Sequence, residues 1–184
     1  MELVWPAEEY LAGYVDALER GWSADNTRPD ARLDELEAIR RDPAAFIALM
    51  VDVDAKGPPV KLPGGREAKR LPGYRRWMWD GEFCGSIGFR WQPGTPELPP
   101  TCLGHIGYGV VPWKQGRGYA TQALAAILPD AKARGLPYVE ITTDVTNVAS
   151  QKVIEKNGGV LVERFHKPAG FGGAEGLRYR VYFR

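Results

Sequence analysis

A glycine-containing turn between a strand-like and a helix-like segment limits most strongly what this chain can fold into. The turn occupies residues 115–120 and contains Gly116 and Gly118. Glycines let the backbone bend so that successive N–H groups point outward. The first turn of the following helix adds unpaired N–H groups and about half a positive charge. The segment therefore predicts a binding site for a phosphate or pyrophosphate, to which Arg117 adds a charged contact.

Glycine-rich turns bind phosphates in several ways, and the sequence separates some of them. A Walker P-loop requires a Lys-Ser or Lys-Thr pair after its last glycine, which is missing here, so that motif is excluded. A dinucleotide-binding turn requires a small residue where Thr121 stands, and too little chain follows for the rest of such a domain. Glu140 is nevertheless spaced to bind a ribose, so the dinucleotide interpretation stays open. A plain connecting turn without a ligand also stays open.

The hydrophobic pattern around the turn predicts a mixed α/β protein. Apolar residues recur at helical spacing in some segments and form strand-like runs in others. Asp80-Gly81 is typical of a β-hairpin turn, and residues 54–73, rich in Gly, Pro and basic side chains, are expected to form a loop or loose hairpin. Helices are expected at 6–20, from 30 onward, and at 42–50, 117–133 and 147–156, and strands at 3–5, 74–79, 82–91, 103–111, 138–143, 160–165 and 178–183. This order favours an antiparallel meander followed by crossover helices.

Length and composition exclude several classes of protein. The 184 residues suit a single domain, 1–184, with a core large enough to fold without metal or disulfides. The net charge of +1 gives no overall attraction to nucleic acid or anionic lipid, and no apolar run approaches the ~20 residues of a membrane helix. Two cysteines and two histidines without ligand spacing predict no metal site. With no signal peptide visible at the start, we expect a cytoplasmic protein.

The turn and its surroundings resemble the GCN5-related N-acetyltransferase (GNAT) superfamily. Its acyl-CoA pyrophosphate loop has the pattern Gln-x-x-Gly-x-Gly/Ala, which segment 115–120 matches. Val110-Val111-Pro112 resembles the end of that family's fourth strand, and Asn147-Val148-Ala149-Ser150, with Asn157-Gly158-Gly159, resembles its fourth helix. The resemblance covers residues 74–165 well. It implies a GNAT-type fold, with a central, mostly antiparallel sheet whose fourth and fifth strands splay apart.

The resemblance also implies an activity and its binding residues. An acetyl group is expected to pass from acetyl-CoA, the cosubstrate, to a primary amine by direct attack, without a metal. Val110 and Val111 are expected to present backbone groups to the pantetheine and the thioester, one N–H stabilising the oxyanion by about 3–4 kcal/mol. Asn147 and Ser150 are expected to contact the pantetheine. The pyrophosphate is expected to bind Gln115, Gly116, Arg117, Gly118, Tyr119 and Ala120.

The general base and acid are less well indicated. His105 has a suitable intrinsic pKa and lies on the strand that leads to the splay, although a local hydrogen-bonding role is an alternative. The other candidate bases are Glu82, which follows the hairpin turn, Asp144 and Tyr108. Many GNAT members carry a tyrosine that protonates the thiolate, seven residues after the helix-opening Asn. Here Ile154 stands at that position, so the hydroxyl of Ser150 or Tyr119, or solvent, is expected to serve.

The acceptor is expected to be a small-molecule or peptide amine, with no nucleic-acid or membrane partner. A homodimer is possible in which the apolar last strand, 179–183, pairs with a second copy. The alternative function is a non-catalytic domain of the same fold that binds or senses acyl-CoA, and the substitution at Ile154 favours it slightly.

Overall fold

The computed structural model describes residues 1–184 and contains two main antiparallel sheets with a gap between them, besides a small two-stranded one. The strand order is β1-β5-β6-β7 in the first sheet, with β2 also paired to β5, and β8-β10-β9 in the second. The first sheet contains β1 (Glu2–Val4), β2 (Val51–Asp52), β5 (Gly73–Trp79), β6 (Phe83–Arg90) and β7 (Ile106–Val110), and the second contains β8 (Tyr138–Asp144), β9 (Val160–His166) and β10 (Glu175–Tyr182). The mixed α/β fold with separated central strands agrees with the expectation.

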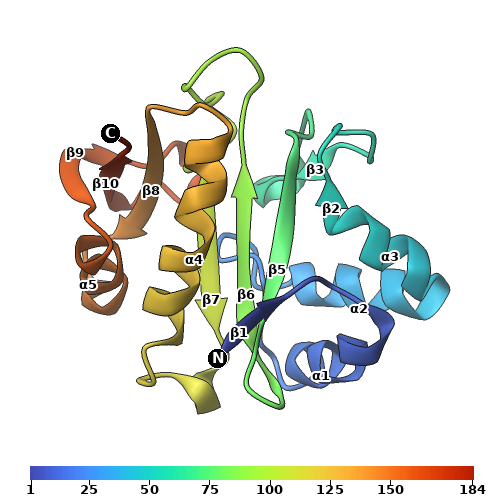
Figure 1. Ribbon diagram of the computed structural model, residues 1–184. Helices are drawn as coiled ribbons and strands as arrows, with labels where there is room; N and C mark the ends of the chain where they lie inside the picture. The colour runs from blue at the N-terminus through green and yellow to red at the C-terminus, as the bar shows by residue number, and fades with distance from the viewer.

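Helices cover both faces of the first sheet (Figure 1). They are α4 (Tyr119–Ala133) on one face and α1 (Glu8–Glu19), α2 (Ala31–Arg41) and α3 (Pro43–Leu49) on the other, whereas α5 (Val148–Lys156) packs against α4 and the second sheet. One core cluster joins α4, through Leu124 and Ile127, to sheet residues such as Ile87. A second joins α1–α3 to the opposite face, where Tyr14 stacks on the fully buried Trp77 with ring centroids 4.7 Å apart. Burial of both sheet faces leaves the gap between β7 and β8 as the opening into the fold.

Local sequence signals determine where several helices begin and end. The carboxylate of Asp42 accepts a hydrogen bond from Ala45 N–H at the start of α3, and Asn147 accepts one from Ser150 N–H at the start of α5. Short polar side chains are preferred at this position because they satisfy N–H groups of a first helical turn. Gly21, with φ of +95°, follows the end of α1, where glycine adopts this conformation without steric cost. None of the helices combines the length and apolar composition needed to cross a bilayer.

The structure confirms the predicted β-hairpin and corrects one expectation about strand pairing. Asp80-Gly81 connects β5 to β6, and residues 54–73 include the small hairpin β3 (Val60–Lys61) and β4 (Glu67–Ala68). The last strand, β10, lies between β8 and β9, and it pairs on both sides as far as Arg180. The expectation that residues 179–183 pair with a second copy is therefore wrong for Tyr179 and Arg180, while Val181 and Tyr182 pair with β8 alone. The outer strands of this sheet are β8, which faces the gap, and β9.

Candidate active site

Strands β7 and β8 meet at one point and separate beyond it. His105, just before β7, donates its backbone N–H to the Glu140 carbonyl on β8 at 2.8 Å. Glu140 N–H donates to Nδ1 of the His105 imidazole at 2.9 Å. No further backbone hydrogen bond joins β7 to β8, so the two strands belong to different sheets. A cavity of about 1280 Å³ opens from this vertex, lined by both strands, the 115–120 turn and the 22–28 loop between α1 and α2.

The backbone of β7 presents alternate residues to this cavity. Val111 N–H donates to the Cys84 carbonyl of β6 at 2.9 Å, so it points away from the gap. The Tyr108 carbonyl accepts the Asn26 side chain at 3.0 Å, and the Val110 carbonyl accepts Gln115 Nε2 at 3.3 Å. Since both backbone groups of a strand residue point to the same side, Val110 faces the gap. Of the two valines expected to supply an oxyanion donor, only Val110 is suitably placed, because the Val111 N–H is already used in the sheet.

The 115–120 turn forms a row of unpaired hydrogen-bond donors at the start of α4. No protein group accepts a hydrogen bond from the backbone N–H groups of residues 116–121, which lie between the paired N–H groups of Gln115 and Gln122. Gly116 and Gly118 have φ of +77° and +76°, a conformation that costs other residues about 1–2 kcal/mol. A Cβ at Gly116 would meet nothing within 4 Å, so glycine is needed there for backbone conformation rather than for space. The arrangement suits an anion with several oxygens.

Asp80, in the β5–β6 turn, holds this row of donors in place. It accepts hydrogen bonds from the Tyr119 hydroxyl at 2.6 Å and from Lys114 Nζ at 3.0 Å, and Arg117 lies 3.9 Å away. These bonds, that of Tyr119 first, hold the pKa of Asp80 well below its usual range. Glu82 pairs with Lys114 at 2.9 Å, which together with Asp80 raises the pKa of that lysine. Glu82 thus supports the turn and does not line the cavity, and the Tyr119 hydroxyl is engaged with Asp80.

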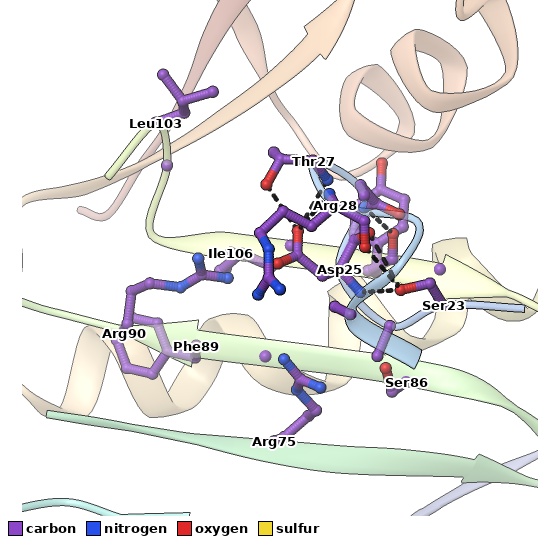
Figure 2. A pocket seen from close by; sticks show the side chains of 18 of the residues that line it. Ser23, Asp25, Thr27, Arg28, Arg75, Ser86, Phe89, Arg90, Leu103 and Ile106 are labelled. Atoms are coloured by element: carbon purple, nitrogen blue, oxygen red, sulfur yellow. Dashed lines mark hydrogen bonds between the residues drawn. The ribbon is translucent and has the colours of Figure 1, made fainter. Parts of the chain in front are cut away.

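The opposite side of the cavity has a floor of β6 and β7 and a wall formed by the 22–28 loop. Figure 2 shows this region, where Arg28, Arg75 and Arg90 extend toward a common space. The loop is closed by Asp25, whose Oδ1 accepts hydrogen bonds from Thr27 N–H at 2.8 Å, the Thr27 hydroxyl at 2.7 Å and Arg28 N–H at 3.2 Å. One end of the cavity therefore carries the unpaired donors of the turn, and the region beneath the 22–28 loop, here called the chamber, is lined by polar and charged side chains.

A family model described as the acetyltransferase (GNAT) domain matches residues 63–160, more than half of the chain. The chain belongs to the GNAT acetyltransferase family. The matched residues include the 115–120 turn, the vertex at His105 and all of α5.

Solved structures of acetyltransferases share the fold. The ribosomal L7/L12 α-N-protein acetyltransferase RimL, in complex with coenzyme A, has a TM-score of 0.62 at 15% identity over 98% of this chain and 93% of that one. The microcin C7 self-immunity acetyltransferase MccE, in complex with acetyl-CoA and AMP, has 0.61 at 14% identity over 98% and 91%. A ribosomal-protein-serine acetyltransferase assigned in Vibrio cholerae has 0.61 at 14% identity over 98% and 92%. The sequence matches none of the curated proteins.

Two hydroxyl groups of this GNAT domain meet across the gap. Tyr108 on β7 lies 2.9 Å from the hydroxyl oxygen of Ser150 on α5, and both residues line the cavity. Burial raises the pKa of Tyr108 to about 12. Ile154, where the resemblance expects a tyrosine, is fully buried in the core and does not line the cavity. The Tyr108–Ser150 pair therefore supplies hydroxyl groups that position 154 does not.

His105 and Asp144, two of the predicted bases, are engaged in the structure. His105 is fully buried behind the vertex and outside the cavity lining, and burial lowers its pKa to about 4. Its Nδ1 already accepts a hydrogen bond, so its geometry fits a role in joining the strands. Asp144 lines the cavity but forms an ion pair with Lys167.

Two parts of the site gave no usable signal in the sequence. The 22–28 loop and Arg90 contain no motif, and they reach the cavity only because distant strands and helices pack together. Asn26, for example, contacts Tyr108, 82 residues away in the sequence. Alternation along β6 could have placed Arg90 on the face opposite the core residue Phe89, but not beside the gap.

Proposed function

We propose that this protein transfers the acetyl group of acetyl-CoA directly to an amine, with a preference for α-amino groups. The observation that carries the proposal is the row of unpaired N–H groups at residues 116–121, beside a gap into which Val110 presents its backbone. An anion-binding helix start next to unpaired strand backbone suits a long cosubstrate with a pyrophosphate at one end and a thioester at the other.

The 115–120 turn binds the pyrophosphate of acetyl-CoA in this proposal. Backbone N–H groups and the helix start offset its negative charge, and Arg117 adds a cation at the surface. The pantetheine then lies in the gap between β7 and β8, with Asn147 and Ser150 on its α5 side. The likeness in fold to MccE and RimL, whose structures contain acetyl-CoA and coenzyme A, supports this placement.

The thioester carbonyl lies against Val110. When the amine attacks, the carbonyl oxygen becomes an oxyanion, and Val110 N–H donates a hydrogen bond to it. Such a donor stabilises a transition state by about 3–4 kcal/mol when the site is already organised. The sheet hydrogen bond of Val111 on one side and the Gln115 contact on the other hold this stretch of backbone in place.

The preference for α-amines follows from the carboxylates that line the cavity, because each already has a bonding partner. Every carboxylate that lines the cavity is bonded to a neighbouring cation, hydroxyl or N–H group: Asp25, Asp34, Glu35, Asp52 and Asp144. An α-amine, with a pKa near 7.7–8.0, is roughly a quarter free base at pH 7.4, whereas a lysine amine is only about 0.1% free base. An α-amine can therefore react without a strong base from the protein.

Ser150 returns the proton to the departing thiolate in this mechanism. The amine attacks the carbonyl carbon, the C–S bond breaks, and the sulfur takes a proton from the Ser150 hydroxyl. The acylated nitrogen releases a proton to Tyr108. Tyr108 passes a proton on to Ser150, 2.9 Å away, and so restores the Ser150 hydroxyl. General acid catalysis of this kind contributes roughly 10²–10⁴-fold to a rate.

Release of free CoA thiol, followed with a thiol-reactive dye, tests the proposal. Two peptides are compared at pH 7.4. The first offers a free α-amine, and the second has its α-amine acetylated and offers the side-chain amine of one lysine. Acetyl-CoA consumption with the first peptide and at least tenfold less with the second is expected. Binding of acetyl-CoA without thiol release for any amine would instead favour the non-catalytic domain. A higher rate with the lysine peptide would refute the α-amine preference.

A further inference from the structure

The chamber beside the gap has a floor formed mainly by glycines. Gly88 on β6 lies opposite Gly107 on β7, and Gly109 lies opposite Ser86. A Cβ atom added at Gly109 would lie 3.6 Å from Trp22 Nε1 and 3.6 Å from Asn26 Oδ1, so the 22–28 loop lies directly above this floor. All three glycines line the cavity, so a ligand there can approach the strand backbone that leads to Val110.

Arg90 extends over this floor with no acidic partner. Its Nη2 lies 3.1 Å from where a Cβ of Gly107 would stand and 3.8 Å from that of Gly88. Its backbone N–H donates to the His105 carbonyl, whereas its guanidinium has no carboxylate within 4.0 Å and forms no hydrogen bond. Arg90 is half-buried and lines the cavity. A guanidinium removed partly from water without a counter-ion is unfavourable, so an anionic ligand would stabilise it.

The neighbouring arginines differ from Arg90 in this respect. Arg28 pairs with Asp34 at 2.7 Å, and Arg75 pairs with Glu35 at 3.4 Å. All three guanidinium groups extend toward one space (Figure 2). Two of the cations are therefore balanced within the protein, and the third is available to a ligand. Its planar donors suit a carboxylate or phosphate, which they can bind with two parallel hydrogen bonds.

We propose that Arg90 binds an anionic group, a carboxylate or a phosphate, on the acetyl acceptor. The inference rests on the proposed function, because Val110 fixes where the amine reacts. Val110 is three positions after Gly107, which lies beneath the guanidinium, and three positions span about 10 Å along a strand. Allowing for contact distances at both ends, the acceptor carries its anion roughly 7–10 Å from its amine. This is the length of two to three extended peptide units.

Calorimetric binding to the protein saturated with coenzyme A tests the inference without requiring turnover. The probes are triglycine and triglycinamide, which share an α-amine and differ in the terminal carboxylate. We expect triglycine to bind at least tenfold more tightly than its amide. Arg90→Gln is expected to reduce this ratio to within about twofold, and Arg90→Lys to give an intermediate ratio. Arg41→Gln, on the exposed end of α2, is the matched control and keeps the wild-type ratio.

A purely structural role of Arg90 predicts a different result, because its loss would weaken both probes equally. Aminohexyl phosphate compared with aminohexanol distinguishes the two anions, since a phosphate-specific site favours this pair over the triglycine pair. Equal binding of acid and neutral probes in both pairs, or no binding of any probe, would overturn the inference. Coenzyme A binding and thiol release are measured separately, so failure of the proposed function shows in those assays and not in the acid-to-amide ratio.

Discussion

His105 gives the most quantitative prediction from the structure. Burial lowers its pKa to about 4, with nearby Arg90 acting in the same direction and Glu140 in the opposite one. In an unfolded chain a histidine titrates near pH 6.5. Between these two values the unfolded chain binds a proton that the folded protein does not, so the free energy of unfolding falls as the pH is lowered from 6.5 to about 4. At 1.36 kcal/mol per pH unit, His105 accounts for a loss of about 3 kcal/mol.

Urea denaturation followed by tryptophan fluorescence between pH 7 and pH 4 measures this loss. Carboxylates also titrate in acid, so wild type is compared with His105→Gln, which keeps a neutral acceptor for Glu140 N–H but does not titrate. The wild-type free energy of unfolding is expected to fall about 3 kcal/mol further than that of the variant. Parallel curves would refute the reasoning. If the variant does not fold, titration of the His105 ring protons by NMR provides the same test, with an expected midpoint near pH 4 and a contradictory one near 6.5.

Four further substitutions have defined outcomes. In steady-state kinetics, Ser150→Ala and Tyr108→Phe are expected to lower kcat by about 10–100-fold while changing the KM for acetyl-CoA by less than threefold. A large change in KM instead would contradict the role of these residues in proton transfer. Gly85→Ala is expected to destabilise the fold by more than 2 kcal/mol in thermal unfolding, because φ is +149° and the new Cβ would lie 2.2 Å from the Gly109 carbonyl. Asp42→Ala removes the α3 cap and is expected to cost about 1 kcal/mol in the same assay, with unchanged stability arguing against the cap.

Features encoded by neighbouring residues were predictable from the sequence. The 115–120 turn depends on two glycines and the helix they precede, and the caps at Asp42 and Asn147 depend on contacts within three residues. The β5–β6 hairpin follows from Asp80-Gly81. In each case the decisive free energy is local, since a positive φ or an unpaired N–H group is satisfied within one turn of chain.

Features that depend on long-range packing were not predictable. His105 looked suitable as a base because its intrinsic pKa is near neutral, and only its burial against Glu140 shows that the ring is engaged. Val111 and Val110 are alike in sequence, and the sheet register alone separates them. The position of β10 as a central strand likewise depends on which strands pair, to which an apolar sequence gives no direction.

Binding of acetyl-CoA at the 115–120 turn is the central claim, and a thermal shift tests it most directly. Acetyl-CoA at about 100 times its Kd adds ~2.7 kcal/mol, which raises the Tm of a protein of this size by roughly 5–10 °C. Gly118→Val is expected to abolish the shift. The matched control is Gly135→Val, at the opposite end of α4, where φ is also +76° and no atom lies within 4 Å of the new Cβ. A shift lost in Gly118→Val and kept in Gly135→Val is the predicted result; no shift in wild type, or an equal shift in both variants, would contradict the account.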